Sequence, residues 1–218
     1  MVTGFRESLT RVKPIRMREP LAETLGAVDG RGVLLDYSFV DVVKMAGHAC
    51  PTVSAAYLIC EMALERLYGP AAPVRGEIAV TVYGEPDDGV YGVMAQVFSF
   101  ITGAAPATGF KGLGPKFKRK DLLTFSNERI DPEAMCFEFE RRDTGDALLV
   151  KFFSNRVPFP EDKARKMSRL MAPAIWDAAP EAEQRQFRDL WMEKVEHILL
   201  DREGIENWIQ MERKGANN

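Results

Sequence analysis

One short stretch holds the residues of this chain best suited to chemistry: Gly47-His48-Ala49-Cys50-Pro51. Pro51 is a natural first helical residue, because its missing N–H would have no partner inside the helix. Apolar residues at helical spacing follow from Val53 to Leu67, and Gly69-Pro70 ends the pattern. The sequence therefore predicts a helix over 51–68 with Cys50 at its N-terminus.

That position makes Cys50 a candidate for catalysis or metal binding. A helix N-terminus presents unpaired N–H groups and the positive end of the helix dipole, which stabilise a thiolate. His48 lies two residues away and is a candidate second ligand or general acid/base for the same ion or substrate. The alternative is that Cys50 only caps the helix and that His48 makes an ordinary backbone contact.

The ligand types favour zinc if this site binds a metal. Thiolate and imidazole suit Zn²⁺ or another late first-row ion better than Mg²⁺ or Ca²⁺. A closed structural zinc site takes four protein ligands, whereas this turn offers two, His48 and Cys50. We therefore expect an open site, completed by water, by substrate or by an acidic side chain such as one from the 85–88 loop.

A second candidate site is the glycine-rich, basic segment 104–120. Its glycines let backbone N–H groups approach an anion, and Lys111, Lys116 and Lys118 supply positive charge. These three lysines are our candidate anion- or cofactor-binding residues. The spacing of a Walker A phosphate loop is missing. The alternative is an exposed basic loop at a subunit or strand edge.

The rest of the pattern predicts an α+β protein with three parts. Residues 1–37 are expected to be an irregular arm that is mobile or wraps a partner chain. Residues 38–157 are expected to be the core domain, and residues 158–218 a helical extension. In the core domain the sequence predicts helices over 38–46, 51–68 and 90–103, strands over 76–83 and 122–125, and a hairpin of 135–141 with 147–153. In the extension it predicts helices over 161–177, 181–202 and 203–213.

The composition of the chain limits its expected partners and cellular location. The chain has 218 residues, of which 46% are hydrophobic and 28% charged, as is ordinary for a soluble globular protein. The net charge of −3 gives no overall electrostatic case for nucleic acid. We expect no membrane partner, because no apolar run approaches the length of a membrane span and the first residues lack a signal-peptide core. Three unevenly spaced cysteines do not make a disulfide framework, which predicts a reducing, cytoplasmic location.

The Gly47–Pro51 stretch resembles the FmdE family, which takes its name from a component of formylmethanofuran dehydrogenase and in which a Gly-His-x-Cys-Pro-Gly segment opens a helix. The resemblance extends more loosely over residues 38–153, through Thr102-Gly103, the run 112–125, and the hairpin 137–145. Two positions depart from the family pattern. Thr52 stands where the family has glycine, and Ala46 stands where it often has a second histidine.

The resemblance implies an intertwined homodimer with a divalent metal, expected to be zinc, near His48 and Cys50. It also implies a metal- or thiol-dependent protein of redox or molybdenum/tungsten-enzyme metabolism, with these two residues as the catalytic pair. An apolar stripe on the predicted helix 181–202 supports a dimer as well. Two alternatives stay open. One is a non-catalytic module that binds a small anionic ligand against the 109–120 loop, and the other is a purely structural homodimer.

Overall fold

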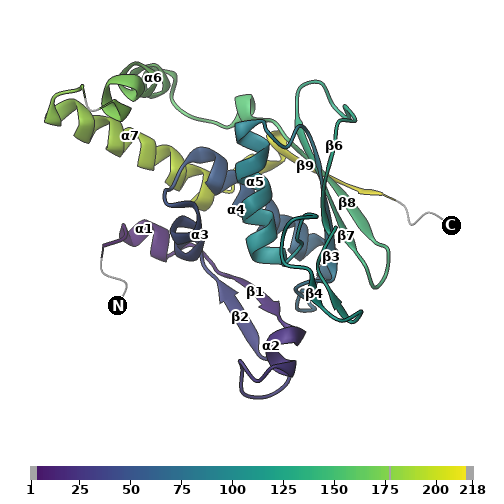
Figure 1. The fold of residues 1–218 in the computed structure, drawn as a ribbon. Helices are drawn as coiled ribbons and strands as arrows, with labels where there is room; N and C mark the ends of the chain where they lie inside the picture. The colour runs from purple at the N-terminus through teal and green to yellow at the C-terminus, as the bar shows by residue number, and fades with distance from the viewer. Residues whose placement is uncertain (1–3, 177, 215–218) are drawn as a thin grey trace.

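The computed structural model describes residues 4–176 and 178–214 and has an α+β fold built on a five-stranded mixed sheet (Figure 1). The strand order is β6-β3-β7-β8-β9. Only the β3–β6 pair is parallel among these strands. The bounds are β3 Ile78–Tyr83, β6 Leu123–Ser126, β7 Met135–Arg141, β8 Ala147–Phe152 and β9 Ile209–Lys214. The predicted α+β class and the 135–153 hairpin are confirmed.

Helices cover one face of this sheet, as Figure 1 shows. The helices α4 Pro51–Tyr68 and α5 Gly89–Thr102 lie against the strands, and α3 Phe39–Ala46 and α7 Glu181–Leu200 pack against α4. Phe98 of α5 packs edge-on against Phe137 and Phe139 of β7, with ring centroids 5.1 Å apart in both pairs. The α4 helix is central to the core, since most of its side chains are buried. It is therefore a rigid support for the turn that precedes it.

Local capping explains why α3 ends and α4 begins where the sequence predicts. Ser38 caps α3 in a reciprocal capping box with Asp41. Gly47 ends α3 in the left-handed conformation, with φ of 76°, which glycine adopts without steric cost. The chain then turns through His48 and Ala49 into α4, with Cys50 as the N-cap and Pro51 as the first helical residue.

The N-terminal segment is more ordered than the sequence suggests. It contains α1 Glu7–Thr10, α2 Pro20–Thr24, and a two-stranded antiparallel ribbon of β1 Ile15–Arg18 and β2 Leu34–Tyr37. Ile15 and Met17 of β1 are buried in the main core. The expectation of an irregular segment is therefore wrong for the described residues, because this segment forms helices and a ribbon whose side chains pack against the rest of the chain.

The C-terminal segment begins with a helical hairpin, α6 Glu161–Ile175 followed by α7. Figure 1 shows this hairpin extending away from the sheet at the upper left. The predicted helix over 203–213 is wrong. Residues 209–214 form β9, which pairs with β8 from Ile209 opposite Phe152 to Lys214 opposite Ala147. The backbone groups of the β8 edge are satisfied by this pairing, and that long-range gain overrides the local helical pattern.

Part of the C-terminal apolar stripe is also accounted for within the chain. Val195, Ile198 and Leu199 are buried in the main core rather than free for a partner. Within residues 4–176 and 178–214, the helices all fall short of the length and apolarity needed to cross a bilayer.

Candidate functional site

The turn between α3 and α4 places Cys50 where the sequence predicts. The Cys50 Sγ atom accepts a hydrogen bond from the Val53 N–H, at 3.4 Å, and thereby caps α4. The Ser54 hydroxyl donates to the Cys50 carbonyl oxygen at 2.9 Å, which fixes the first turn of the helix. A backbone N–H directed at sulfur stabilises negative charge on it, so the geometry suits a thiolate.

His48 is exposed beside this turn, and one of its ring nitrogens is engaged. Its Nδ1 atom lies 2.9 Å from the Ala46 carbonyl oxygen. Because a carbonyl oxygen only accepts hydrogen bonds, Nδ1 carries the proton and Nε2 of the neutral ring keeps its lone pair. His48 therefore presents Nε2 as a metal ligand or proton acceptor, and the contact with Ala46 fixes this tautomer.

Helix α7 covers the turn, which the sequence did not predict. The Trp191 Nε1–H of α7 donates to the Ala49 carbonyl oxygen at 2.8 Å. Cys50, the next residue, is only 9% exposed. Trp191 was recognisable in the sequence as part of an apolar stripe, but its 142-residue separation from Ala49 left no local sign of this contact. The nucleophile candidate thus lies under a helical cover to which Trp191 contributes a side-chain hydrogen bond.

The other two cysteines differ from Cys50 in their surroundings. Cys60 is completely buried on α4, and burial raises the pKa of its thiol above the usual range. Cys136 of β7 is also buried, and burial likewise raises the pKa of its thiol. Neither thiol caps a helix. Cys50 is therefore the thiol best placed for chemistry within the described residues.

The turn offers two side chains of the types that bind zinc, the imidazole of His48 and the thiol of Cys50. Over the described part of the chain, no group of three or more His, Cys, Asp and Glu side chains is arranged to hold one metal ion. A metal at this turn would take His48 Nε2 and Cys50 Sγ from this chain, with water, substrate or a second copy completing its coordination. In the 85–88 loop, Asp88 is engaged in capping α5, since its Oδ1 accepts the Val90 N–H at 3.0 Å.

The basic segment forms a small hairpin on the surface. Its strands are β4 Gly112–Leu113 and β5 Phe117–Lys118. Lys111, Lys116 and Lys118 are exposed. Within the described residues, none of the three has a carboxylate within ion-pair distance. The structure thus places the three predicted anion-binding lysines on one surface hairpin, with no carboxylate of the described residues within 4.0 Å of them.

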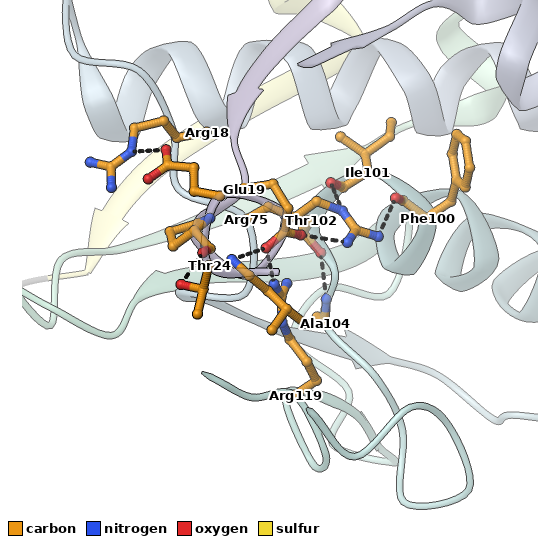
Figure 2. Close-up of polar contacts among 12 residues, drawn as sticks. Arg18, Glu19, Thr24, Arg75, Phe100, Ile101, Thr102, Ala104 and Arg119 are labelled. Atoms are coloured by element: carbon orange, nitrogen blue, oxygen red, sulfur yellow. Dashed lines mark hydrogen bonds and ion pairs between the residues drawn. The ribbon is translucent and has the colours of Figure 1, made fainter. Parts of the chain in front are cut away.

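Arg119 departs from the other cations of this segment, because it points into the protein. Its side chain is only 3% exposed, and its Nη2 lies 2.6 Å from Glu19 Oε1. Glu19 Oε2 lies 2.8 Å from Nη1 of Arg75. Figure 2 shows the two guanidinium groups converging on this one carboxylate. Glycine is required at positions 76 and 103, where a Cβ atom would overlap the Arg119 guanidinium.

This network joins three segments that are far apart in the sequence. Arg75 also donates to the carbonyl oxygens of Phe100 and Ile101 at the end of α5, at 3.0 and 3.1 Å (Figure 2). Glu19 also caps α2 by accepting the Leu21 N–H. The network of Glu19, Arg75 and Arg119 therefore connects the N-terminal ribbon and the end of α5 to the residue that follows β5 of the basic hairpin. The sequence offered no signal for it, since Glu19 and Arg119 are 100 residues apart.

Comparison with known proteins adds no assignment: no family model matches the chain, and no curated protein matches it.

Proposed function

We propose that this chain is an FmdE-like protein of metal- or thiol-dependent chemistry, in redox or molybdenum/tungsten-enzyme metabolism, whose open site is Cys50 with His48. One observation carries the proposal. The Cys50 sulfur accepts a backbone N–H at the N-terminus of the buried helix α4, beside a histidine whose Nε2 has no hydrogen-bond partner among the described residues.

Each residue has a defined part in this proposal. Cys50 is the thiolate that attacks an electrophilic centre or binds the metal ion. His48 Nε2 is the second ligand, or it accepts and returns a proton at the reacting group. A bound zinc ion would supply Lewis-acid chemistry. The rigid α4 and the Trp191 contact keep both side chains in place before any ligand arrives.

The proposal extends to assembly and location. All three cysteines are free thiols, which supports a reducing, cytoplasmic setting. Trp176 and Ile175 at the end of α6 are 76% and 65% exposed, and large apolar side chains in such positions support a homodimer. Sedimentation at micromolar concentration tests this, and a single 24.5 kDa species would exclude the dimer.

Zinc binding is the direct test of the two ligands. Zinc content is measured by mass spectrometry and by titration for untagged wild type, His48→Ala and Cys50→Ser, with His197→Ala as the matched histidine control. We expect binding in the wild type and in the control, and its loss in both turn variants with unchanged circular dichroism. Zinc that stays bound in both turn variants would show that other residues hold it.

A second candidate function is supported by the basic hairpin. Three exposed lysines without carboxylate partners among the described residues favour an anionic ligand there. Sulfate or phosphate should then raise the melting temperature more than chloride at matched ionic strength, by mass action. The same response in a Lys111→Ala/Lys116→Ala/Lys118→Ala variant would show that the hairpin lysines do not bind the anion.

A further inference from the structure

A cleft of about 370 Å³ lies beside the site, between the first turns of α4 and α5, the adjoining ends of β7 and β8, and helix α7. Its size is in the range of small-molecule pockets. Thr52 of α4 lines the cleft, but His48 and Cys50 do not. The cleft is therefore lined by residues other than the proposed ligands His48 and Cys50.

Two oppositely charged side chains are among the residues that line this cleft. Lys194 of α7 and Asp88 at the start of α5 both line it. In the part of the chain that the structure describes, neither has an oppositely charged group within 4.0 Å. Lys194 Nζ lies 5.6 Å from the centre of the Phe159 ring, and Asp88 uses only Oδ1, for capping. The Lys194 ammonium and Asp88 Oδ2 therefore have no charged partner among the described residues.

Three residues with hydroxyl groups also line the cleft, and their hydroxyls have no hydrogen-bond partner among the described residues. The side chains of Thr52, Tyr91 and Ser154 line the cleft. None of their hydroxyls has a hydrogen-bond partner within residues 4–176 and 178–214. Each can donate and accept a hydrogen bond, so they can complete the contacts of a polar ligand head.

The remaining wall is apolar. Met135, Phe152 and Ile198 are among its side chains, and Phe152 and Ile198 belong to the buried core. An apolar wall with a few converging polar groups is typical of a site that orients a small molecule by its polar end.

We propose that the cleft binds a small zwitterion with an apolar body, of the chemical class of the apolar α-amino acids. The ligand carboxylate pairs with Lys194, its ammonium pairs with Asp88, and its side chain lies on the apolar wall. The charges of the lining favour this class over simple ions. A zwitterion can pair with both side chains, whereas a monoanion would pair with Lys194 but be repelled by Asp88, and a monocation would pair with Asp88 but be repelled by Lys194.

The test uses L-leucine and two compounds that each lack one of its charges. These are 4-methylpentanoate, without the amino group, and 3-methylbutylamine, without the carboxylate. Binding to the full chain is measured by calorimetry and by NMR shift changes. We expect leucine to bind at least about tenfold more tightly than either fragment. Wild type that ignores leucine at millimolar concentration, or that binds a fragment as tightly, would overturn the proposal.

Two substitutions locate the ligand. Asp88→Asn keeps a helix-capping side chain, so α5 is expected to stay intact. Lys194→Met keeps the length and apolar stem of the side chain. Each should weaken leucine binding about tenfold, and Asp88→Asn should remove the preference for leucine over 4-methylpentanoate. Lys166→Met on α6 is the matched control and should bind as wild type does. Wild-type affinity in both cleft variants would overturn the proposal even if leucine binds elsewhere.

Discussion

Removing the carboxylate of Glu19 should destabilise the protein strongly, because two buried or half-buried cations depend on it. The Glu19 side chain is 8% exposed and contacts Arg119, which is 3% exposed, and Arg75, which is 24% exposed. Arg119 Nη1 already lacks a hydrogen-bond partner among the described residues, and burial lowers the pKa of this guanidinium from its usual value. In Glu19→Ala both terminal nitrogens of Arg119 would be left without an acceptor.

The expected loss follows from the cost of an uncompensated buried charge. Breaking a buried ion pair by removing one partner costs about 3–5 kcal/mol of unfolding free energy. For a chain of this length, that corresponds to a fall in melting temperature of about 6–20 °C. The matched control is Glu65→Ala. Glu65 pairs with Lys13 on the surface, where the two side chains are 58% and 70% exposed. This change should cost less than about 1 kcal/mol.

Urea unfolding and thermal melting of the two variants at neutral pH measure this difference. A double variant, Glu19→Ala/Arg119→Met, should recover part of the loss, because it also removes the stranded charge. If Glu19→Ala were no more destabilising than Glu65→Ala, the network would not fix the ribbon and the basic hairpin as we infer.

Three further predictions follow from the same structure. Burial raises the pKa of the Cys60 thiol, so Cys60 should react with Ellman's reagent only after denaturation, and equal rates in native and denatured protein would contradict its burial. A chain truncated after residue 200 lacks β9 and exposes the β8 edge, so it should aggregate; a soluble fragment with a cooperative melt would show that β9 is dispensable. The hydrogen bond from Arg141 holds the pKa of Asp143 below its usual range. Its stabilising effect is therefore present above the unfolded pKa and is lost as pH falls through the folded value. Asp143→Asn should flatten the acid side of the stability profile, and an unchanged profile would refute this.

Features with local causes could be predicted from the sequence. The Ser38 capping box, the left-handed Gly47 and the Pro51 start of α4 are each encoded within a few residues. The hairpin of β7 and β8 is likewise encoded by alternation around a short turn. This is why the α+β class and the helix-opening position of Cys50 could be predicted.

Features that depend on distant partners could not be predicted. β9 forms because the β8 edge is available, although residues 203–213 have a helical pattern. Arg119 belongs to a run of basic residues in the sequence, yet its side chain is buried in an ion pair with Glu19. The contact of Trp191 with Ala49 also joins segments that no local pattern relates. In each case a long-range interaction decides between states that local propensity leaves open.

The central claim, a reactive thiol at Cys50, is tested most directly by site-resolved alkylation of the native protein. Iodoacetamide labelling is followed by peptide mass spectrometry, so that Cys50, Cys60 and Cys136 report separately in one sample. Our account predicts that Cys50 is labelled first, because its sulfur alone accepts a helix N-terminal N–H among these three, and that added zinc slows this labelling. Equal rates at the three cysteines, or faster labelling of Cys136, would contradict it.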